Sequence, residues 1–380
     1  MSKLITSHLE HISSFLAMEV FAKAEELEKQ GRDIIHLEFG EPDFPTPEII
    51  ANVGIQSIRD ARTKYTHTQG IEDFRNAVVK KYKRQYNVGI APSQILTSSG
   101  SSILLYLAMR LLIPPGDEVI MTDLCYACYD NLAMIGGAKP VRVSLRLENG
   151  FQLDIDEVKK AITPRTRAIL INSPMNPTGT VLSEKCMREL AELGIPIISD
   201  EIYGDLVYEG EPYSALNFTE NCIVLNGLSK FYAMTGWRLG YMIMKPEWVK
   251  VAARVHQNMM ISAAHFVQDA GTVAINEAES ECRKMAEEFD NRRRFLLKRL
   301  KEIGLDPGYN PVGAFYVLLK YPDQSLKSLD LSMDILEKCG VALTPGIDFG
   351  AAGEGFLRIS YANSKENIDE AINRLKDYFG

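Results

Sequence analysis

Short apolar runs alternate with segments of helical spacing along the middle of this 380-residue chain, and this pattern constrains its fold more than any other feature. The predicted strands cover residues 94–97, 118–121, 168–171, 195–198 and 223–225. The clearest helices between them cover residues 103–112 and 184–193. Strands that alternate with helices are typical of a parallel sheet covered by helices. The sequence therefore predicts an α/β fold with a mostly parallel sheet.

The two ends of the chain carry further elements. Helices are expected at residues 15–30, after Pro47, at 71–82, at 329–339 and from Lys365 onward. Strands are expected at 34–39, 315–319, 341–343 and 356–361. Residues 248–303 follow a helical pattern that is too long for one ordinary helix. We expect two or three helices there, the last of which crosses between two domains.

Composition excludes several classes of protein. The length suggests about two or three domains, and an apolar content of 46% with 24% charged residues is ordinary for a globular protein. A net charge of −8 without a basic cluster argues against nucleic-acid binding. No apolar run reaches the ~20 residues of a membrane helix, and Met1-Ser-Lys-Leu-Ile lacks a signal-peptide core. We expect a cytoplasmic protein with six reduced cysteines.

The stretch from Asn226 to Tyr241 carries the most reactive chemistry. Lys230 follows an apolar strand and lies between a serine and two aromatic residues, and Arg238 follows between two glycines. An amine in apolar surroundings loses its proton more easily, as a Schiff-base lysine requires. An arginine can bind a phosphate in a forked geometry. The alternative is a surface lysine followed by a structural arginine.

The residues that follow each predicted strand are candidate ligand contacts, because open parallel sheets bind ligands at the carboxyl ends of their strands. Gly100-Ser101-Ser102 opens a helix whose free N–H groups could bind a phosphate. Tyr126 could stack on a flat ring, and Asn176 could donate to an oxygen from a proline-bounded loop. The structural alternatives are a helix cap, a packed aromatic residue and a turn asparagine.

Asp200 follows another apolar strand, and Tyr203 lies three residues later. A carboxylate at this place is half buried and requires a cationic partner, unless it caps a helix. One ligand would use all of these groups: pyridoxal 5′-phosphate. Its aldehyde requires a lysine, its pyridine nitrogen an acid, its phenolic oxygen hydrogen-bond donors, and its phosphate a helix end and an arginine. Consecutive strand ends supply these groups, and the set as a whole predicts the cofactor.

With these residues identified, the chain resembles the class I/II aminotransferases, pyridoxal-phosphate enzymes of fold type I, over nearly its whole length. The motifs that carry the resemblance, in family order, are Gly40-Glu-Pro-Asp-Phe-Pro-Thr-Pro, Asn172-Ser-Pro-Met-Asn-Pro-Thr-Gly, Ser199-Asp-Glu-Ile-Tyr, the stretch from Ser229-Lys to Gly240, and Phe356-Leu-Arg-Ile-Ser. The resemblance implies a large cofactor domain at 45–285 and a small domain built from 1–44 and 286–380. It also implies a homodimer with shared active sites.

The same resemblance implies roles around the cofactor ring. Lys230 would be the Schiff-base lysine and the catalytic acid–base, and Asp200 would pair with the pyridinium nitrogen and so also act in catalysis. Asn176 and Tyr203 would contact the phenolic oxygen, with Tyr203 among the catalytic residues. Tyr126 would stack on the ring.

Roles at the phosphate and at the substrate carboxylate follow in the same way. The implied phosphate ligands are Ser101, Ser102, Arg238 and, from the neighbouring subunit, Tyr65. Arg358 would bind the α-carboxylate of the substrate bidentately, with Gly40 and Asn176 beside it. No metal site is expected.

Two departures from common motifs stand out. Many family members carry a phosphate-binding Ser or Thr three residues before the lysine, where this chain has Gly227. Cys125-Tyr-Ala-Cys128 is a CxxC without a second pair, so we expect neither a zinc site nor a redox role.

The predicted activity is transfer of an amino group from an L-amino acid to a 2-oxo acid by a ping-pong mechanism, with 2-oxoglutarate as the expected acceptor. The donor could be aspartate, an aromatic or an aliphatic amino acid. A carbon–sulfur β-lyase on the same fold is the alternative. A non-catalytic ligand-sensing domain is disfavoured, because the lysine is retained and no DNA-binding module is attached.

The substrate side chain is expected to meet a soft, uncharged wall. In some aspartate aminotransferases a partner-subunit arginine after the phosphate arginine binds the distal carboxylate, but residues 255–282 contain no lysine or arginine. Methionines in this stretch offer an adaptable apolar surface. A dicarboxylate would need hydrogen bonds, His256 or His265, or an arginine from elsewhere. The alternative is that this stretch points away from the site.

Overall fold

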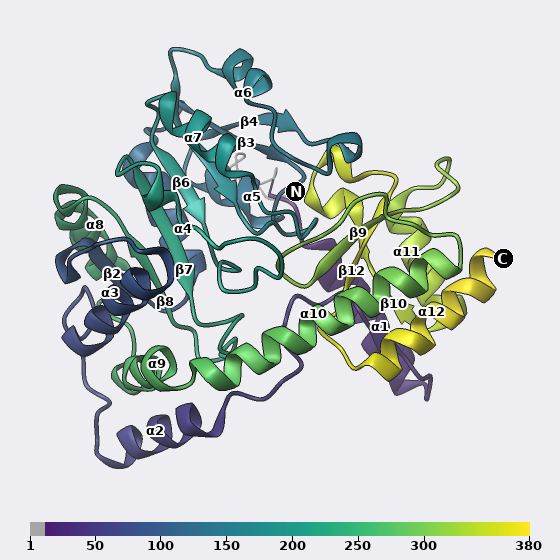
Figure 1. Cartoon of the computed structure of the whole chain (residues 1–380), viewed down its shortest axis with the longest axis horizontal. Helices are drawn as coiled ribbons and strands as arrows, with labels where there is room; N and C mark the ends of the chain where they lie inside the picture. Colours follow the sequence, from purple (N-terminus) through teal and green to yellow (C-terminus); the bar gives the residue numbers. More distant parts are fainter. Residues whose placement is uncertain (1–11) are drawn as a thin grey trace, which may run out of the picture.

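A seven-stranded sheet organises the larger part of the chain (Figure 1), and its strands lie in the order β2-β8-β7-β6-β5-β3-β4. The strands are β2 (Ile95–Ser98), β3 (Glu118–Asp123), β4 (Lys139–Ser144), β5 (Thr166–Asn172), β6 (Ile197–Asp200), β7 (Cys222–Gly227) and β8 (Gly240–Ile243). Strand β8 runs antiparallel to both neighbours, and the other pairs are parallel. The computed structural model, which describes residues 12–380, therefore confirms the predicted α/β fold with a mostly parallel sheet.

Helices cover both faces of this sheet because successive strand residues point to opposite sides. In β3, Val119 and Met121 pack with the helices of one face, whereas Ile120 belongs to the core of the other. The first face carries α4 (Ser101–Leu112), α5 (Cys128–Ile135) and α8 (Pro246–Met259). The second carries α3 (Glu72–Tyr86), α6 (Ile155–Ala161), α7 (Glu184–Glu192) and α9 (His265–Glu277), and α2 (Glu48–Arg59) packs on α9.

The two chain ends come together in a second, smaller group of elements. Its strands are β1 (Ile35–His36), β9 (Tyr316–Lys320), β10 (Val341–Ala342), β11 (Thr344–Pro345) and β12 (Phe356–Ser360). Strand β1 pairs with β10, while β11, β12 and β9 form an antiparallel sheet. The helices are α1 (Leu16–Lys29), α11 (Ser328–Cys339) and α12 (Lys365–Phe379). Helix α10 (Glu279–Glu302) spans from α9 to this group (Figure 1), as expected for the last of the three helices at 248–303.

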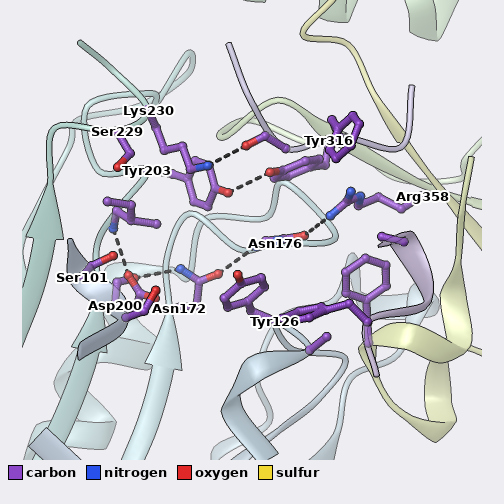
Figure 2. A pocket seen from close by; sticks show the side chains of 18 of the residues that line it. Ser101, Tyr126, Asn172, Asn176, Asp200, Tyr203, Ser229, Lys230, Tyr316 and Arg358 are labelled. Atoms are coloured by element: carbon purple, nitrogen blue, oxygen red, sulfur yellow. Dashed lines mark hydrogen bonds between the residues drawn. The ribbon is translucent and has the colours of Figure 1, made fainter. Parts of the chain in front are cut away.

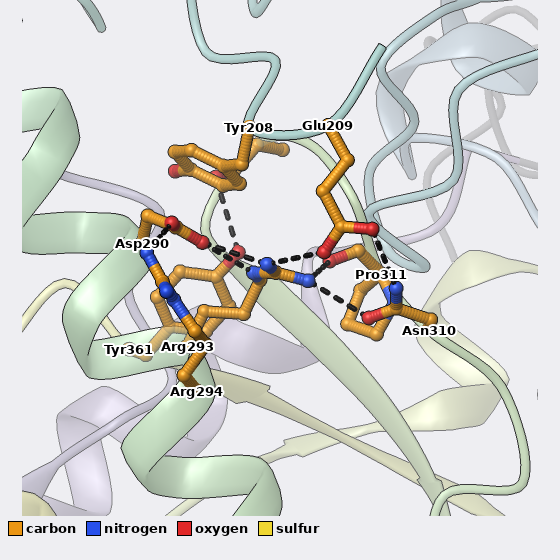
Figure 3. Close-up of polar contacts among 9 residues, drawn as sticks. Tyr208, Glu209, Asp290, Arg293, Arg294, Asn310, Pro311 and Tyr361 are labelled. Atoms are coloured by element: carbon orange, nitrogen blue, oxygen red, sulfur yellow. Dashed lines mark hydrogen bonds and ion pairs between the residues drawn. The ribbon is translucent and has the colours of Figure 1, made fainter.

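Arg293 links α10 to two loops, one of which lies 84 positions away in the sequence (Figure 3). Its guanidinium pairs with Asp290 on the same helix and with Glu209 at 2.6 Å. It also donates to the Asn310 side chain at 2.8 Å and to the Pro311 carbonyl at 3.1 Å. Because the side chain is only 3% exposed, these partners replace the water that a buried charge would lose.

Several elements differ from the predictions, each for a local reason. The strand expected at 34–39 keeps only Ile35–His36, because the Glu38 carbonyl accepts hydrogen bonds from the Arg358 and Thr344 side chains. Helix α4 begins at Ser101, two residues earlier than predicted. Strand β4 was not predicted because most of it is half-buried or exposed and lacks a continuous apolar run.

Residues 1–11 lie outside the described residues, and with them the prediction about a signal peptide and the first part of the proposed small domain. Between residues 12 and 380, none of the helices is both long and apolar enough to cross a membrane.

Candidate active site

A cavity of about 330 Å³ lies where the carboxyl ends of the large-sheet strands meet β12 and the start of α1 (Figure 2). This volume is at the lower end of the ~300–1,000 Å³ typical of small-molecule sites. Ten predicted site residues line it, namely Gly40, Ser101, Ser102, Tyr126, Asn176, Asp200, Tyr203, Lys230, Arg238 and Arg358. The eleventh, Tyr65, lies elsewhere and is 81% exposed.

Lys230 lies in the cavity wall three residues beyond the end of β7. Its amine donates to the Gly40 carbonyl at 2.5 Å. Burial lowers the pKa of Lys230 to about 8, and the positive charges of Arg358 and Arg238 act in the same direction, against Glu41. An amine with this pKa is partly neutral near pH 7, so it can serve as a nucleophile or a base.

Asp200 ends β6 and is held by two neutral donors. The Tyr129 hydroxyl donates to its Oδ2 at 2.7 Å, and the Ile202 backbone N–H donates to its Oδ1 at 3.2 Å. Burial raises the pKa of Asp200, and both hydrogen bonds and the charge of Lys230 oppose that rise. The helix-cap alternative is wrong, since a turn and no helix follows this residue.

Asn172 connects the end of β6, which carries Asp200, to the loop that carries Asn176 (Figure 2). Its Nδ2 donates to the Asp200 carbonyl at 2.9 Å, and its Oδ1 accepts from the Asn176 N–H at 2.8 Å. Since Asn172 ends β5 and pairs with Asp200 at the end of β6, the parallel register places Asp200 and the loop after β5 at the same sheet edge. The side chain therefore fixes the spacing of two cavity groups.

Arg358 points from β12 into the cavity and is 5% exposed. Its guanidinium donates to Asn176 Oδ1 and Thr344 Oγ1, each at 3.0 Å, and lies 4.5 Å above the ring centre of Tyr316. Its Nε has no hydrogen-bond partner among the described residues. A buried, unpaired donor on a fixed guanidinium is suited to a carboxylate ligand.

A cradle for an anion forms where α4 begins. Gly100 precedes the helix with a φ of +92°, and no side chain caps the first turn. A Cβ at Gly100 would lie 2.4 Å from the Arg238 guanidinium, and one at Gly240 would lie 2.7 Å from the Ser101 nitrogen. The glycines thus let Arg238 approach the positive end of the α4 dipole, where phosphates bind.

Aromatic residues complete the walls of the cavity. Tyr126 meets Tyr129 edge to face, with ring centres 5.7 Å apart. Tyr203 and Tyr316 share a hydrogen bond of 2.8 Å between their hydroxyls. A Cβ at Gly40 would lie 2.1 Å from the Tyr316 hydroxyl, so a larger residue there would displace the Tyr316 side chain.

Tyr129, Asn172 and Tyr316 contact predicted site residues but were not singled out from the sequence. Tyr129 follows Tyr126 by three positions, a spacing that places both on one side of a helical turn. Asn172 opens a motif that was used only for its second asparagine. Tyr316 is the first residue of β9 and gives no signal of its own.

Two sequence-derived candidates, His256 and His265, are not among the residues that line the cavity. His256 is fully buried beneath the sheet end, where its Nε2 is 2.9 Å from Ser98 Oγ, so it cannot reach a substrate. Cys125 and Cys128 are both free thiols. At Gly227, an added Cβ would meet the Leu239 carbonyl at 3.0 Å, so this position has little room for a larger residue.

Comparison with known proteins shows that the sequence of this chain is similar to those of enzymes. The family model "Aminotransferase class I and II" matches residues 32–375. The chain is 42% identical over 380 residues to a (5-formylfuran-3-yl)methyl phosphate transaminase of Methanocaldococcus jannaschii, covering 99% of each protein. It is 38% identical to an aspartate aminotransferase of Pyrococcus horikoshii, over 94% of this chain and 93% of that protein.

Solved structures of such enzymes are also similar to this chain. The aspartate aminotransferase from Thermus thermophilus with maleate matches with a TM-score of 0.93 at 34% identity, over 99% of this chain and 100% of that one. These relatives are named for amino-group transfer, which does not favour the β-lyase alternative.

Proposed function

The chain belongs to the class I and II aminotransferases, a family that depends on pyridoxal phosphate, and from this premise we propose the cofactor, the residue roles and the substrates of its site. It is an aminotransferase. Its proposed reaction exchanges the amino group of an L-amino acid for the oxo group of a 2-oxo acid, with 2-oxoglutarate as the acceptor. The observation that carries the proposal is the convergence of Lys230, Asp200 and Arg358 on one cavity.

The cavity offers a suitable group for each part of pyridoxal 5′-phosphate. The glycine-lined cradle of Arg238 and the first turn of α4 suits the phosphate. Tyr126 offers an aromatic face to the ring, Asp200 an acid to the ring nitrogen, and Lys230 a partly neutral amine to the aldehyde. When bound, the protonated ring withdraws electrons from the substrate carbon that loses its proton.

The protein's own residues would bind and orient the substrate and move one proton. Arg358 binds the α-carboxylate through its unpaired Nε and the edge of its guanidinium. Arginine has only donors, so Asn176 presents its oxygen to Arg358 and keeps its NH₂ group for the cavity, where it can donate to the phenolic oxygen. Tyr203 is a second donor there. Lys230 takes the proton from the substrate Cα, for which a pKa near the working pH is suited.

We propose a homodimer in which Tyr65 of each subunit completes the phosphate site of the other. The side chain is largely exposed and cannot serve the cavity of its own chain. An apolar groove beside α2, lined by Ile55, Ile58, Trp237 and Phe266, offers a surface that a second copy would cover.

The domain division and the location are also proposals. The strands of the large sheet lie between residues 95 and 243, and the antiparallel sheet lies between 316 and 360, which supports a large domain at 45–285 and a small one from 1–44 and 286–380. Six unpaired cysteines support a reducing, cytoplasmic environment.

The test uses the purified protein with added pyridoxal 5′-phosphate. The wild type should be yellow, lose that colour irreversibly with borohydride, and form glutamate from 2-oxoglutarate and an amino donor. Lys230→Ala should do none of these. Irreversible labelling of the alanine variant would show that another lysine holds the cofactor, and ammonia release without an oxo acid would indicate a lyase.

A further inference from the structure

Tyr129 donates a hydrogen bond to Asp200 and has no part in the reaction proposed above. We infer that Tyr129 is a positioning residue that keeps the Asp200 carboxylate ionised and thereby keeps the proton of the ion pair on the cofactor ring nitrogen. This inference rests on the proposed function, because it concerns the residue that would meet the pyridine ring.

The geometry commits Tyr129 to Asp200. The tyrosine belongs to the first turn of α5, is 2% exposed, and its hydroxyl lies 2.7 Å from Asp200 Oδ2. The other carboxylate oxygen accepts the Ile202 N–H, and Asn172 holds the Asp200 carbonyl. The carboxylate of Asp200, which lines the cavity, is thus restrained on both oxygens and at its backbone.

Tyr129 can only donate in this contact. Burial raises the pKa of its phenol well above the usual value, and the charge of Asp200 raises it further. The phenol therefore keeps its proton throughout the physiological range, and a carboxylate is the acceptor that it meets. Hydrogen bonds to the charged form of a group stabilise that form, so this bond opposes the burial that favours a protonated Asp200.

The consequence concerns where a shared proton lies. Between a carboxylate and a pyridine nitrogen, the proton can sit on the oxygen or on the nitrogen. A donor bound to the carboxylate makes the oxygen less basic and favours the nitrogen, which is the state that withdraws electrons. Tyr129 also meets Tyr126 edge to face, so one side chain supports both the proposed stacking face and the acid.

The test compares Tyr129→Phe with Tyr82→Phe. Phenylalanine keeps the ring and removes only the hydroxyl. Tyr82 is an equally buried phenol outside the cavity, whose hydroxyl has no partner among the described residues, so it controls for the loss of a buried hydroxyl. Each protein is loaded with ¹⁵N-labelled pyridoxal 5′-phosphate, and the ring-nitrogen resonance is measured together with kcat and KM.

Tyr129→Phe should shift the ring-nitrogen resonance toward the unprotonated form and lower kcat by ~10–100-fold, the effect of losing one hydrogen bond to a charged group. KM should stay within about twofold of the wild type, because ground-state binding is untouched. Tyr82→Phe should leave the resonance and kcat unchanged. In the Asp200→Asn background, removal of the Tyr129 hydroxyl should have no further effect on the resonance.

A wild-type resonance and kcat in Tyr129→Phe would overturn the inference, and so would a loss of thermal stability without a spectral shift. If Tyr129→Phe does not fold, equal resonances for Asp200→Asn and the wild type would overturn it, because the ion pair would then not set the ring proton. A chain that binds no cofactor at all refutes the proposed function instead, so the two failures are distinguishable.

Discussion

Asn176 and Arg358, 182 positions apart in the chain, share a hydrogen bond of 3.0 Å between Oδ1 and Nη1. The bond joins the loop after β5 of the large sheet to β12 of the small one. It helps to orient the Arg358 guanidinium. The guanidinium also stacks on the ring of Tyr316 and donates to Thr344 Oγ1. The proposed carboxylate site therefore depends on both groups of elements at once.

Arg358→Lys should lower kcat/KM for every amino donor to a similar degree. An ammonium cannot reproduce the fork of a guanidinium or its stacking on Tyr316, so kcat/KM should fall by ~100-fold, the cost of losing one charged, paired contact. Steady-state kinetics with several donors measures this. Arg294→Lys, on the exposed side of α10, is the matched control and should have no effect. A loss confined to one donor would mean that Arg358 contacts the side chain and not the α-carboxylate.

The rate at which the cofactor-free protein captures pyridoxal 5′-phosphate should rise with pH and level off above about 8. The reason is the pKa of Lys230, which burial lowers to about 8. At pH 7 about one tenth of such an amine is neutral, against roughly one in three thousand for an ordinary lysine. Stopped-flow absorbance between pH 6 and 10 measures the rate, with Lys230→Ala as the background. A rate that still climbs at pH 10 contradicts a lowered pKa.

Mixed dimers test the role of Tyr65. In a heterodimer of Tyr65→Phe and Lys230→Ala subunits, one site carries both lesions and the other carries neither, provided that Tyr65 acts across the interface. Activity should then exceed that of either parent after mixing and reassociation. An active monomer at the assay concentration, or a mixture no better than the average of its parents, contradicts the proposal.

Arg293→Ala should lower the free energy of unfolding by ~2–4 kcal/mol, because it leaves Asp290 and Asn310 without their buried cationic partner. Arg294→Ala is the matched control on the same helix (Figure 3). Its side chain is 65% exposed, so its ion pair with Asp290 should contribute less than ~1 kcal/mol. Urea unfolding of the three proteins gives the comparison, and equal losses would show that the network around Arg293 is not stabilising.

The enzyme should accept aromatic and aliphatic donors alongside dicarboxylates. The apolar residues that line the cavity include Phe15, Met18, Phe39 and Phe349. Among the described lining residues the cations are Lys230, Arg238 and Arg358, which already have proposed roles. The measurement is kcat/KM for phenylalanine, leucine, alanine and aspartate with one acceptor. A preference for aspartate by several orders of magnitude would mean that another group, such as one from the partner subunit, binds the distal carboxylate.

The sequence by itself determined the strand ends that carry the chemistry. Asp200, Asn176 and Lys230 could be found because each follows a short apolar run, and such runs reflect local burial on both sheet faces. The helices at 15–30 and 184–193 could also be found, because the helical spacing of their apolar residues is a local property of the sequence. Strand β8 was missed, because Gly240–Ile243 follows directly on the arginine motif and was interpreted as part of it.

Only the tertiary structure decided which of these groups meet. Tyr129 reaches Asp200 across 71 positions, and Arg358 reaches Asn176 across 182. The first contact depends on the strand order of the large sheet, and the second depends on the folding of the C-terminal part of the chain against that sheet. Neither contact leaves a periodic trace in the sequence. A hydrogen bond requires its two atoms within about 3 Å, a condition set by the packing of whole elements rather than by neighbours along the chain.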